Sequence, residues 1–225
     1  MKRLICVAVL GAAAALAQAA DVALEAELGD LEEPMVVAVP SDVVPEGGEA
    51  PDEPSGGKFV WAPGPPATGG GDAGFIALEF NISAAGQYAV WGRIVAWDGN
   101  SDSFWVKIDG ADPDENPQES KNTHFRWSVN PKGTVWAWDR VNQWLDGGTF
   151  ERVWELSAGK QLLTIYSRET AAMLDCVFIT DNLSETADDV PLRTPNPDDV
   201  ALQTGQTANV EPQGKLASFW AELKH

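Results

Sequence analysis

The segment Trp154–Asn182, WELSAGKQLLTIYSRETAAMLDCVFITDN, contains two apolar stretches that predict the last strands of a β-sheet domain. They flank a polar loop, Ser167–Thr170. The second stretch, Met173–Thr180, is apolar on both faces except for Asp175. Burying a carboxylate among apolar neighbours costs free energy unless the carboxylate pairs with a cation or binds a metal. The partner of Asp175 is therefore the first question that the sequence raises.

The chain before this segment carries several more short stretches in which apolar and polar residues alternate. Turn-forming Gly, Pro, Asn and Asp residues separate them, and we see neither a convincing helix inside the domain nor an internal repeat. Many short strands divided by turns predict an all-β chain folded as an antiparallel β-sandwich. The alternating or apolar stretches are 21–28, 35–39, 59–61, 76–82, 88–97 and 104–108, followed by short strands and turns around Trp127, Trp136, Trp138 and Trp144.

The N-terminus has the features of a secretory signal peptide. Lys2 and Arg3 precede the apolar run Leu4–Leu16, and Ala17-Gln18-Ala19 matches an A-x-A cleavage site. The run is too short to span a bilayer comfortably. We therefore expect residues 1–20 to be removed, and the mature chain to be a soluble protein in an extracellular or periplasmic location.

The charge balance excludes one class of partner. The chain has 15 Lys and Arg against 34 Asp and Glu, a formal net charge of −19. Nucleic-acid binding requires clustered basic residues, so we expect no nucleic-acid partner. Cys176 is the only cysteine left after removal of the signal, which excludes an intramolecular disulfide and predicts a small buried core residue.

The last forty residues change character. The region 184–214 is polar, with scattered Pro and Asp, and predicts a flexible tail after a domain of residues 21–183. In the segment Lys215–His225, apolar residues recur at helical spacing and predict a short amphipathic helix. A helix this short is marginal by itself, so we expect it to dock on its own domain or on a protein partner.

Five motifs in order resemble the carbohydrate-binding modules of the family 6 and family 35 type, which are galactose-binding-like β-sandwiches. They are EAEL (Glu25–Leu28), AAGQYAVWGRIVA (Ala84–Ala96), SDSFWVKIDG (Ser101–Gly110), ELSAGKQLLTI (Glu155–Ile165) and SRETAAMLDCVFITD (Ser167–Asp181). The resemblance spans residues 23–181 and implies a β-jelly roll that binds a poly- or oligosaccharide.

The resemblance also implies a structural Ca²⁺ held by acids of the first and last strands. Carried over to this chain, the ligands are Glu25, Glu27 and Asp175, completed by backbone carbonyls. Calcium prefers several hard oxygen ligands, which agrees with three carboxylates on strands that could lie together. The alternative is that the two glutamates are solvated and that Asp175 pairs with an arginine. A cation loop at Asp98–Asp102 is less favoured than an ordinary turn, because it lacks the EF-hand Gly and Glu.

The chain has ten Trp and two Tyr, a proportion that favours glycan binding when the Trp rings are exposed. In the resembling families the usual site lies in loops at one edge of the sandwich. The residues that fit this site by position are Trp61, Trp127, Trp136 and Trp138, with Arg168 and Glu169 as polar partners. Many family 6 members carry a ligand-binding Asn where this chain has Met173, so the identity of the sugar cannot be inherited.

Two alternatives to the loop site stay open. Trp91, Arg93, Trp105 and Lys107 oppose the core-facing residues of their strands and could form a flat platform on one sheet. Alternatively, the Trp residues fill the core and no glycan site exists, which favours a structural or interaction protein that uses the sandwich as a scaffold.

Catalysis is not expected. The mature chain has two histidines, His124 and His225, and no G-x-S-x-G motif to present a serine nucleophile. The count of Cys and His also excludes the usual zinc sites. A pair of carboxylates for glycoside hydrolysis is available, but abundant acids do not by themselves indicate one.

Overall fold

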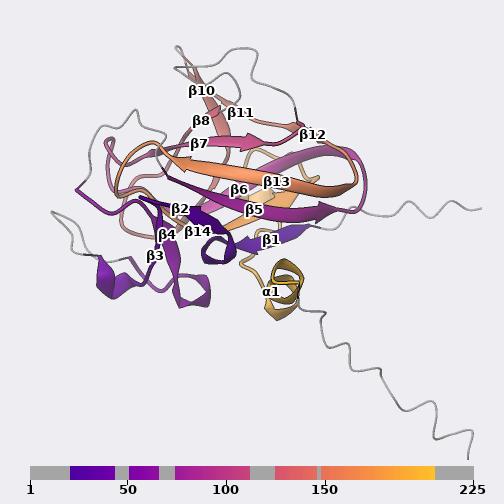
Figure 1. The fold of residues 1–225 in the computed structure, drawn as a ribbon. Helices are drawn as coiled ribbons and strands as arrows, with labels where there is room; N and C mark the ends of the chain where they lie inside the picture. Colours follow the sequence, from indigo (N-terminus) through magenta and orange to yellow (C-terminus); the bar gives the residue numbers. More distant parts are fainter. Residues whose placement is uncertain (1–20, 44–50, 66–73, 112–124, 146–147, 206–225) are drawn as a thin grey trace, which may run out of the picture.

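The computed structural model describes residues 21–43, 51–65, 74–111, 125–145 and 148–205, which fold into two antiparallel sheets (Figure 1). The first sheet contains β1 (Val22–Glu25), β3 (Val36–Ala38), β4 (Phe59–Trp61), β6 (Gly86–Val95), β9 (Ala137–Arg140), β12 (Trp154–Leu156) and β14 (Met173–Thr180). The second contains β2 (Asp30–Glu32), β5 (Phe75–Ile82), β7 (Ser103–Ile108), β8 (Phe125–Ser128) and β13 (Gly159–Ser167). A separate hairpin pairs β10 (Asn142–Leu145) with β11 (Gly148–Glu151). This confirms the prediction of an all-β antiparallel sandwich.

Strand β14 lies at the centre of the first sheet. One edge of β14 pairs with β6, and the other edge pairs with β4 at Met173–Leu174 and with β1 from Cys176 to Ile179. The register between β14 and β6 shifts between Leu174 and Cys176, and Asp175 occupies that irregularity. The strand is apolar on both faces because both faces of the sheet are covered.

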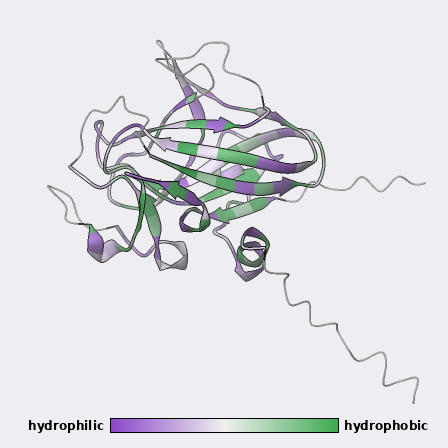
Figure 2. Ribbon diagram, viewed as in Figure 1, coloured by the Kyte–Doolittle hydropathy of each residue, from purple (hydrophilic) through white to green (hydrophobic). Residues whose placement is uncertain are grey.

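The inner face is covered by the second sheet. Figure 2 shows hydrophobic residues along the strands of both sheets and hydrophilic residues at the loops and turns. Side chains from the two sheets form one core that includes Trp127 and Trp154, both fully buried. The core is tight at Gly92, where an added Cβ would lie 2.3 Å from the Trp127 ring.

The outer face of the first sheet is covered by two segments of the chain. Val43, from the segment after β3, belongs to a cluster with Phe59, Trp61, Trp136 and Met173. Leu183, Val190 and Leu192, from the segment after β14, pack in a second cluster against the sheet residues Ala23, Trp91, Phe178 and Trp138. The buried Cys176 lies on β14 between these clusters, in agreement with its prediction as a buried residue.

The region after β14 differs from the predicted flexible tail. It contains the turn η4 (Ala187–Asp189) and the helix α1 (Pro197–Gln203), whose Asn196 side chain accepts N–H bonds from Asp198 and Asp199. Helix α1 lies against β1, where the Gln203 side chain donates to the Glu25 carbonyl (2.8 Å) and accepts from the Glu25 N–H (2.9 Å). The segment Lys215–His225 and the signal region lie outside the described residues. Among the described residues, none of the helices has the length and apolar character of a membrane span.

The first predicted strand, 21–28, is shorter in the structure. β1 ends at Glu25, and Ala26–Leu28 forms the 3₁₀ turn η1. The chain crosses here from β1 of the first sheet to β2 of the second. At Gly29 the backbone lies so close to β5 that a Cβ would meet the Ile76 side chain at 2.7 Å. The turn therefore separates Glu25 from Glu27, which do not share one strand.

Candidate functional site

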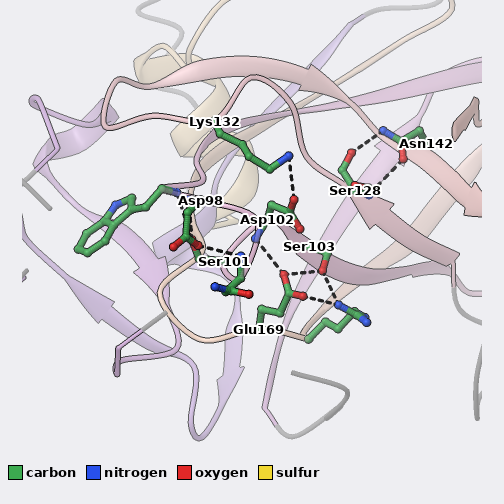
Figure 3. Close-up of polar contacts among 11 residues, drawn as sticks. Asp98, Ser101, Asp102, Ser103, Ser128, Lys132, Asn142 and Glu169 are labelled. Atoms are coloured by element: carbon green, nitrogen blue, oxygen red, sulfur yellow. Dashed lines mark hydrogen bonds and ion pairs between the residues drawn. The ribbon is translucent and has the colours of Figure 1, made fainter. Parts of the chain in front are cut away.

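One edge of the sandwich collects polar side chains from three connections (Figure 3). These are the β6–β7 loop, which carries Asp98, Ser101 and Asp102, the loop after β8, which carries Lys132, and the β13–β14 loop, which carries Glu169. Figure 3 shows Glu169 and Lys132 reaching Asp102 from different loops. We name this group of loops the loop edge.

Short-range hydrogen bonds fix the β6–β7 loop. The Asp98 carboxylate accepts the Asn100 N–H (2.8 Å), and the buried Ser101 hydroxyl accepts the N–H groups of Trp97 and Asp98 at 3.2 Å each. These contacts form an Asx-type turn. The Asp98–Asp102 segment therefore has the geometry of an ordinary turn, as its sequence predicts.

Glu169 fastens the same loop to the β13–β14 loop. Its carboxylate accepts the Asp102 N–H at 2.9 Å and the Ser103 hydroxyl at 2.7 Å, and it pairs with the adjacent Arg168 guanidinium. Arg168 also donates to the Ser103 hydroxyl (2.8 Å) and stacks over the Trp105 ring. Both Arg168 and Glu169 are buried, so they position the loops and present little surface to a ligand.

The accessible charged side chain of the loop edge is Lys132, which pairs with the buried Asp102. Lys132 Nζ lies 2.9 Å from Asp102 Oδ2, and the lysine side chain is 41% exposed. The neighbouring Gly133 N–H donates to the Ala96 carbonyl at 2.7 Å, which holds the Lys132 loop against the end of β6. An ammonium group so placed can donate to hydroxyl groups, while the buried Asp102 fixes its position.

Trp97 is a partly buried aromatic residue of the loop edge, and its Nε1 is buried. It follows Ala96 directly, so it lies beside the Lys132 loop, and its inner side packs on the cluster that contains Trp61 and Trp136. Trp97 and Lys132 are missing from the residues that the sequence singles out. The signal that could have found them is the run of Asp, Gly, Asn and Ser after β6, which predicts a turn at the end of a strand.

The four tryptophans predicted for the site do not gather around a groove. Trp127 is fully buried in the core and donates from Nε1 to Asp139 at 2.6 Å. Trp61 and Trp136 are buried on the outer face of the first sheet, where Trp136 donates to the Asp52 carbonyl. Trp138 is half-buried on the same face, edge-on to Phe178. Trp127 therefore has no face for a sugar, and the other three lie apart from Arg168 and Glu169 in the packing of the outer face.

The alternative platform is divided between the two sheets. Trp91 and Arg93 belong to β6 of the first sheet, whereas Trp105 and Lys107 belong to β7 of the second. Trp91 is also covered by the segment after β14. A flat surface of these four residues is therefore not formed, because alternation along each strand does not reveal which sheet a strand joins.

The candidate calcium ligands meet at the turn η3 (Ser55–Gly57). Glu25 Oε1 accepts the Ser55 hydroxyl at 2.7 Å, and the Ser55 N–H donates to Asp175 Oδ1 at 2.8 Å. A Cβ added at Gly56 would lie 2.8 Å from Glu27 Oε1 and 3.7 Å from Glu25 Oε1. Among the described residues the outer oxygens, Glu25 Oε2 and Glu27 Oε2, are buried and have no hydrogen-bond partner.

The electrostatics of this acidic group depend on Arg93. Its guanidinium pairs with Asp175 Oδ2. Burial nonetheless raises the pKa of Asp175, and burial also raises the pKa of Glu25 and brings that of Glu27 to about 7. The two glutamates, with their unpartnered buried oxygens, have the donor chemistry that Ca²⁺ prefers. Both oxygens of Asp175 already have partners, Arg93 and the Ser55 N–H. Among the described residues, no group of three or more Asp, Glu, His or Cys side chains is arranged to bind a metal.

Comparisons with known proteins give matches among solved structures only. No protein-family model matches the sequence, and no curated protein matches it. The structure is similar to an exo-β-1,3-galactanase from Phanerochaete chrysosporium bound to β-1,3-galactotriose, with 18% identity, a TM-score of 0.43, and coverage of 70% of this chain but 28% of that one. This chain therefore spans less than a third of the galactanase.

Two isolated modules are also similar. One is a family 35 carbohydrate-binding module from Clostridium thermocellum, with 14% identity, a TM-score of 0.45, and coverage of 71% of this chain and 97% of the module. The other is a family 6 module from the Cellvibrio mixtus lichenase 5A in complex with cellotriose, with 17% identity, a TM-score of 0.45, and coverage of 72% and 97%. These modules represent the two families that the sequence motifs resemble.

Proposed function

We propose that this chain is a non-catalytic carbohydrate-binding module that recognises an extracellular poly- or oligosaccharide at the loop edge. The observation that carries the proposal is the exposed Lys132 side chain, paired with Asp102 of the same loop in which the Ser101 hydroxyl accepts the N–H of the partly buried Trp97. An indole can stack on the apolar face of a sugar ring, and the Lys132 ammonium can donate hydrogen bonds to its hydroxyls. Few residues of this kind are needed, since binding sites typically combine an apolar surface with a small number of placed polar groups.

The buried residues of the loop edge would serve this site by holding it rigid. Glu169 bonds to the backbone of Asp102 and to the Ser103 hydroxyl, which fixes the carboxylate partner of Lys132. Trp61 and Trp136 support Trp97 from the cluster beneath it. A site ordered before binding loses less conformational entropy when the ligand arrives. In this proposal Arg168 and Glu169 are positioning residues, and Trp127 belongs to the core.

We also propose that Glu25 and Glu27 hold a structural Ca²⁺. The support is that each has one buried oxygen without a partner in the described residues, and that the two acids lie near Asp175. A bound cation would offset the repulsion among these carboxylates and stabilise the junction of β1 with η3. An exported protein meets calcium at higher concentration than a cytoplasmic one, which agrees with the signal sequence expected for residues 1–20.

A glycan screen of residues 21–225 tests the binding proposal. We expect at least one oligosaccharide to bind, and Trp97→Ala and Lys132→Ala each to weaken that binding roughly tenfold or more. The matched controls are Trp144→Ala, which removes another half-buried Trp, and Lys160→Ala, which removes a lysine near the opposite end of the sheet. The proposal fails if no glycan binds, or if the control variants weaken binding as much as the site variants.

A second candidate function is that of a structural or interaction scaffold. The observation that favours it is the burial of Trp61, Trp127 and Trp136, which removes three aromatic rings from any exposed site. A protein that binds no glycan in the screen, yet associates with another protein in a pull-down from its native extracellular fraction, would support this second function.

A further inference from the structure

A groove of about 460 Å³ lies at the end of the sandwich opposite the loop edge. Helix α1, β1 and the paired ends of β5 and β13 form its walls. Its apolar lining includes Val22, Phe80 and Leu202, and its acidic residues are Asp21, Glu79 and Asp199. A volume of this size is typical of sites that take a ligand or a few side chains of a partner.

Helix α1 presents an exposed apolar side chain, Leu202, to this groove. Leu202 is 75% exposed, the highest value among the large apolar side chains of the described residues, and α1 has no buried residue. A seven-residue helix gains little stability from its own backbone. The cap at Asn196, the Arg193–Asp199 ion pair and the two Gln203 bonds to Glu25 hold it in place. An occupant of the groove would bury Leu202 and add to these contacts.

The sequence of this chain contains a segment that matches the groove. In Lys215–His225 the apolar residues Leu216, Phe219, Trp220 and Leu223 stand at positions i, i+3, i+4 and i+7. This is the spacing with which an amphipathic helix places its apolar face into a groove. The groove is lined by three acids and one lysine, Lys160, which pairs with Glu79. Lys215 and Lys224 lie at the two ends of this stretch, and their charge is complementary to this net negative lining.

We propose that the segment Lys215–His225 docks as an amphipathic helix into this groove of its own domain, covering Leu202 and Phe80. The connection is short enough to favour the same molecule. Gly205 itself lines the groove, and the nine residues 206–214 can span up to roughly 30 Å when extended. A short connection gives the segment a high effective concentration at the groove.

Hydrogen-exchange mass spectrometry on residues 21–225 tests the docking. We expect amides of 200–204 and 215–225 to be protected, and Trp220→Ala or Leu202→Glu to speed their exchange roughly tenfold or more. Ser218→Ala, on the opposite face of the expected helix, is the matched control and should leave exchange unchanged. Exchange of 215–225 in the unaltered chain at the rate of an unstructured peptide would overturn the proposal.

Two further outcomes identify a different occupant and also overturn it. If protection rises with protein concentration and light scattering gives the mass of a dimer, the groove holds the segment of a second copy. If protection of 215–225 appears only with vesicles of phosphatidylglycerol, the segment binds a lipid surface. Protection that is independent of concentration, in a monomer without vesicles, supports docking within one chain.

Discussion

Arg93 on β6 and Asp175 on β14 form an ion pair between the two central strands of the first sheet. The Asp175 side chain is fully buried, whereas the Arg93 side chain is 22% exposed and its guanidinium lies over the Trp136 ring. The Ser55 N–H satisfies the second oxygen of Asp175. The acid that interrupts an apolar strand is thus partnered from the neighbouring strand and from η3, and it connects the sheet to the segment that covers its outer face.

Replacing Asp175 by Asn should lower the free energy of unfolding by about 3 kcal/mol, because Arg93 would keep its charge in a largely buried position without a partner. Urea denaturation of the two proteins measures the difference. Asp109→Asn removes a pair with Lys107 in which the carboxylate is 52% exposed, and should cost less than about 1 kcal/mol. Equal losses in the two variants would contradict the importance of burial for the Arg93–Asp175 pair.

The acidic group at η3 should make stability depend on pH. Burial raises the pKa of Glu27 from 4.5 to about 7, so the folded state holds this proton at pH values where the unfolded chain has released it. The stability from this group is therefore greatest below pH 4.5 and falls as the pH rises through 7. In EDTA we expect Tm to decrease from pH 5 to pH 8, and Glu27→Gln to reduce that decrease.

The response to Ca²⁺ should distinguish Glu27 from Asp139, a second buried acid whose pKa is raised to about 7. Burial also raises the pKa of Asp139 to about 7, so Asp139→Asn should likewise reduce the dependence of Tm on pH. Addition of Ca²⁺ at pH 8 should raise Tm of the unaltered protein and of Asp139→Asn, but not of Glu27→Gln. An equal calcium response in all three proteins, or none in any, would argue against the proposed site.

Gly92→Ala should destabilise the core by about 1–3 kcal/mol, because the added methyl group overlaps the Trp127 ring and lies 3.2 Å from Leu174. Trp127→Phe should recover part of this loss, since the smaller ring leaves room for the methyl group. A double-mutant cycle by chemical denaturation measures the coupling. Additive effects of the two substitutions would show that the Trp127 ring does not limit the space at residue 92.

Glu169→Ala should both loosen the loop edge and lower stability by about 3 kcal/mol, since it removes the buried carboxylate that pairs with Arg168 and accepts the Asp102 N–H. Faster amide exchange in residues 98–103 is the specific readout. Glu155→Ala, at an exposed position on β12, provides the comparison and should leave these amides unaffected.

The strands were predictable from sequence because their alternation or apolar length is local information. Phe59–Trp61 and Met173–Thr180 form strands with the predicted bounds. The 3₁₀ turn at Ala26–Leu28 was missed because it arises where the chain passes from the first sheet to the second. That crossing is set by the pairing of β2 with β5, which is not visible in the local sequence. Helix α1 was missed because seven residues with three polar side chains give no helical pattern, and its stability comes from its cap and from Glu25 on a distant strand.

The candidate site was harder to predict because burial decides it. A Trp on an outward-facing position suggests an exposed ring only if nothing covers that face. Here the segments around Val43 and Val190 cover the outer face of the first sheet, and their apolar residues are too sparse in the sequence to indicate it. The resemblance to the family 6 and family 35 modules suggested a position for Arg168 and Glu169 in loops at one edge, but their mutual pairing requires the folded loops.

The two ends of the described chain leave the sandwich side by side. Asp21 and Gly205 line the same groove, and Val22 is opposite Ile179 at the far end of β14, whereas Met173 at its other end adjoins the loop edge. Anything attached beyond either residue is therefore held about 20 Å away along the strand from Trp97 and Lys132. A protein anchored through a tag at these ends would present its loop edge outward, which makes surface immobilisation suitable for measuring glycan binding.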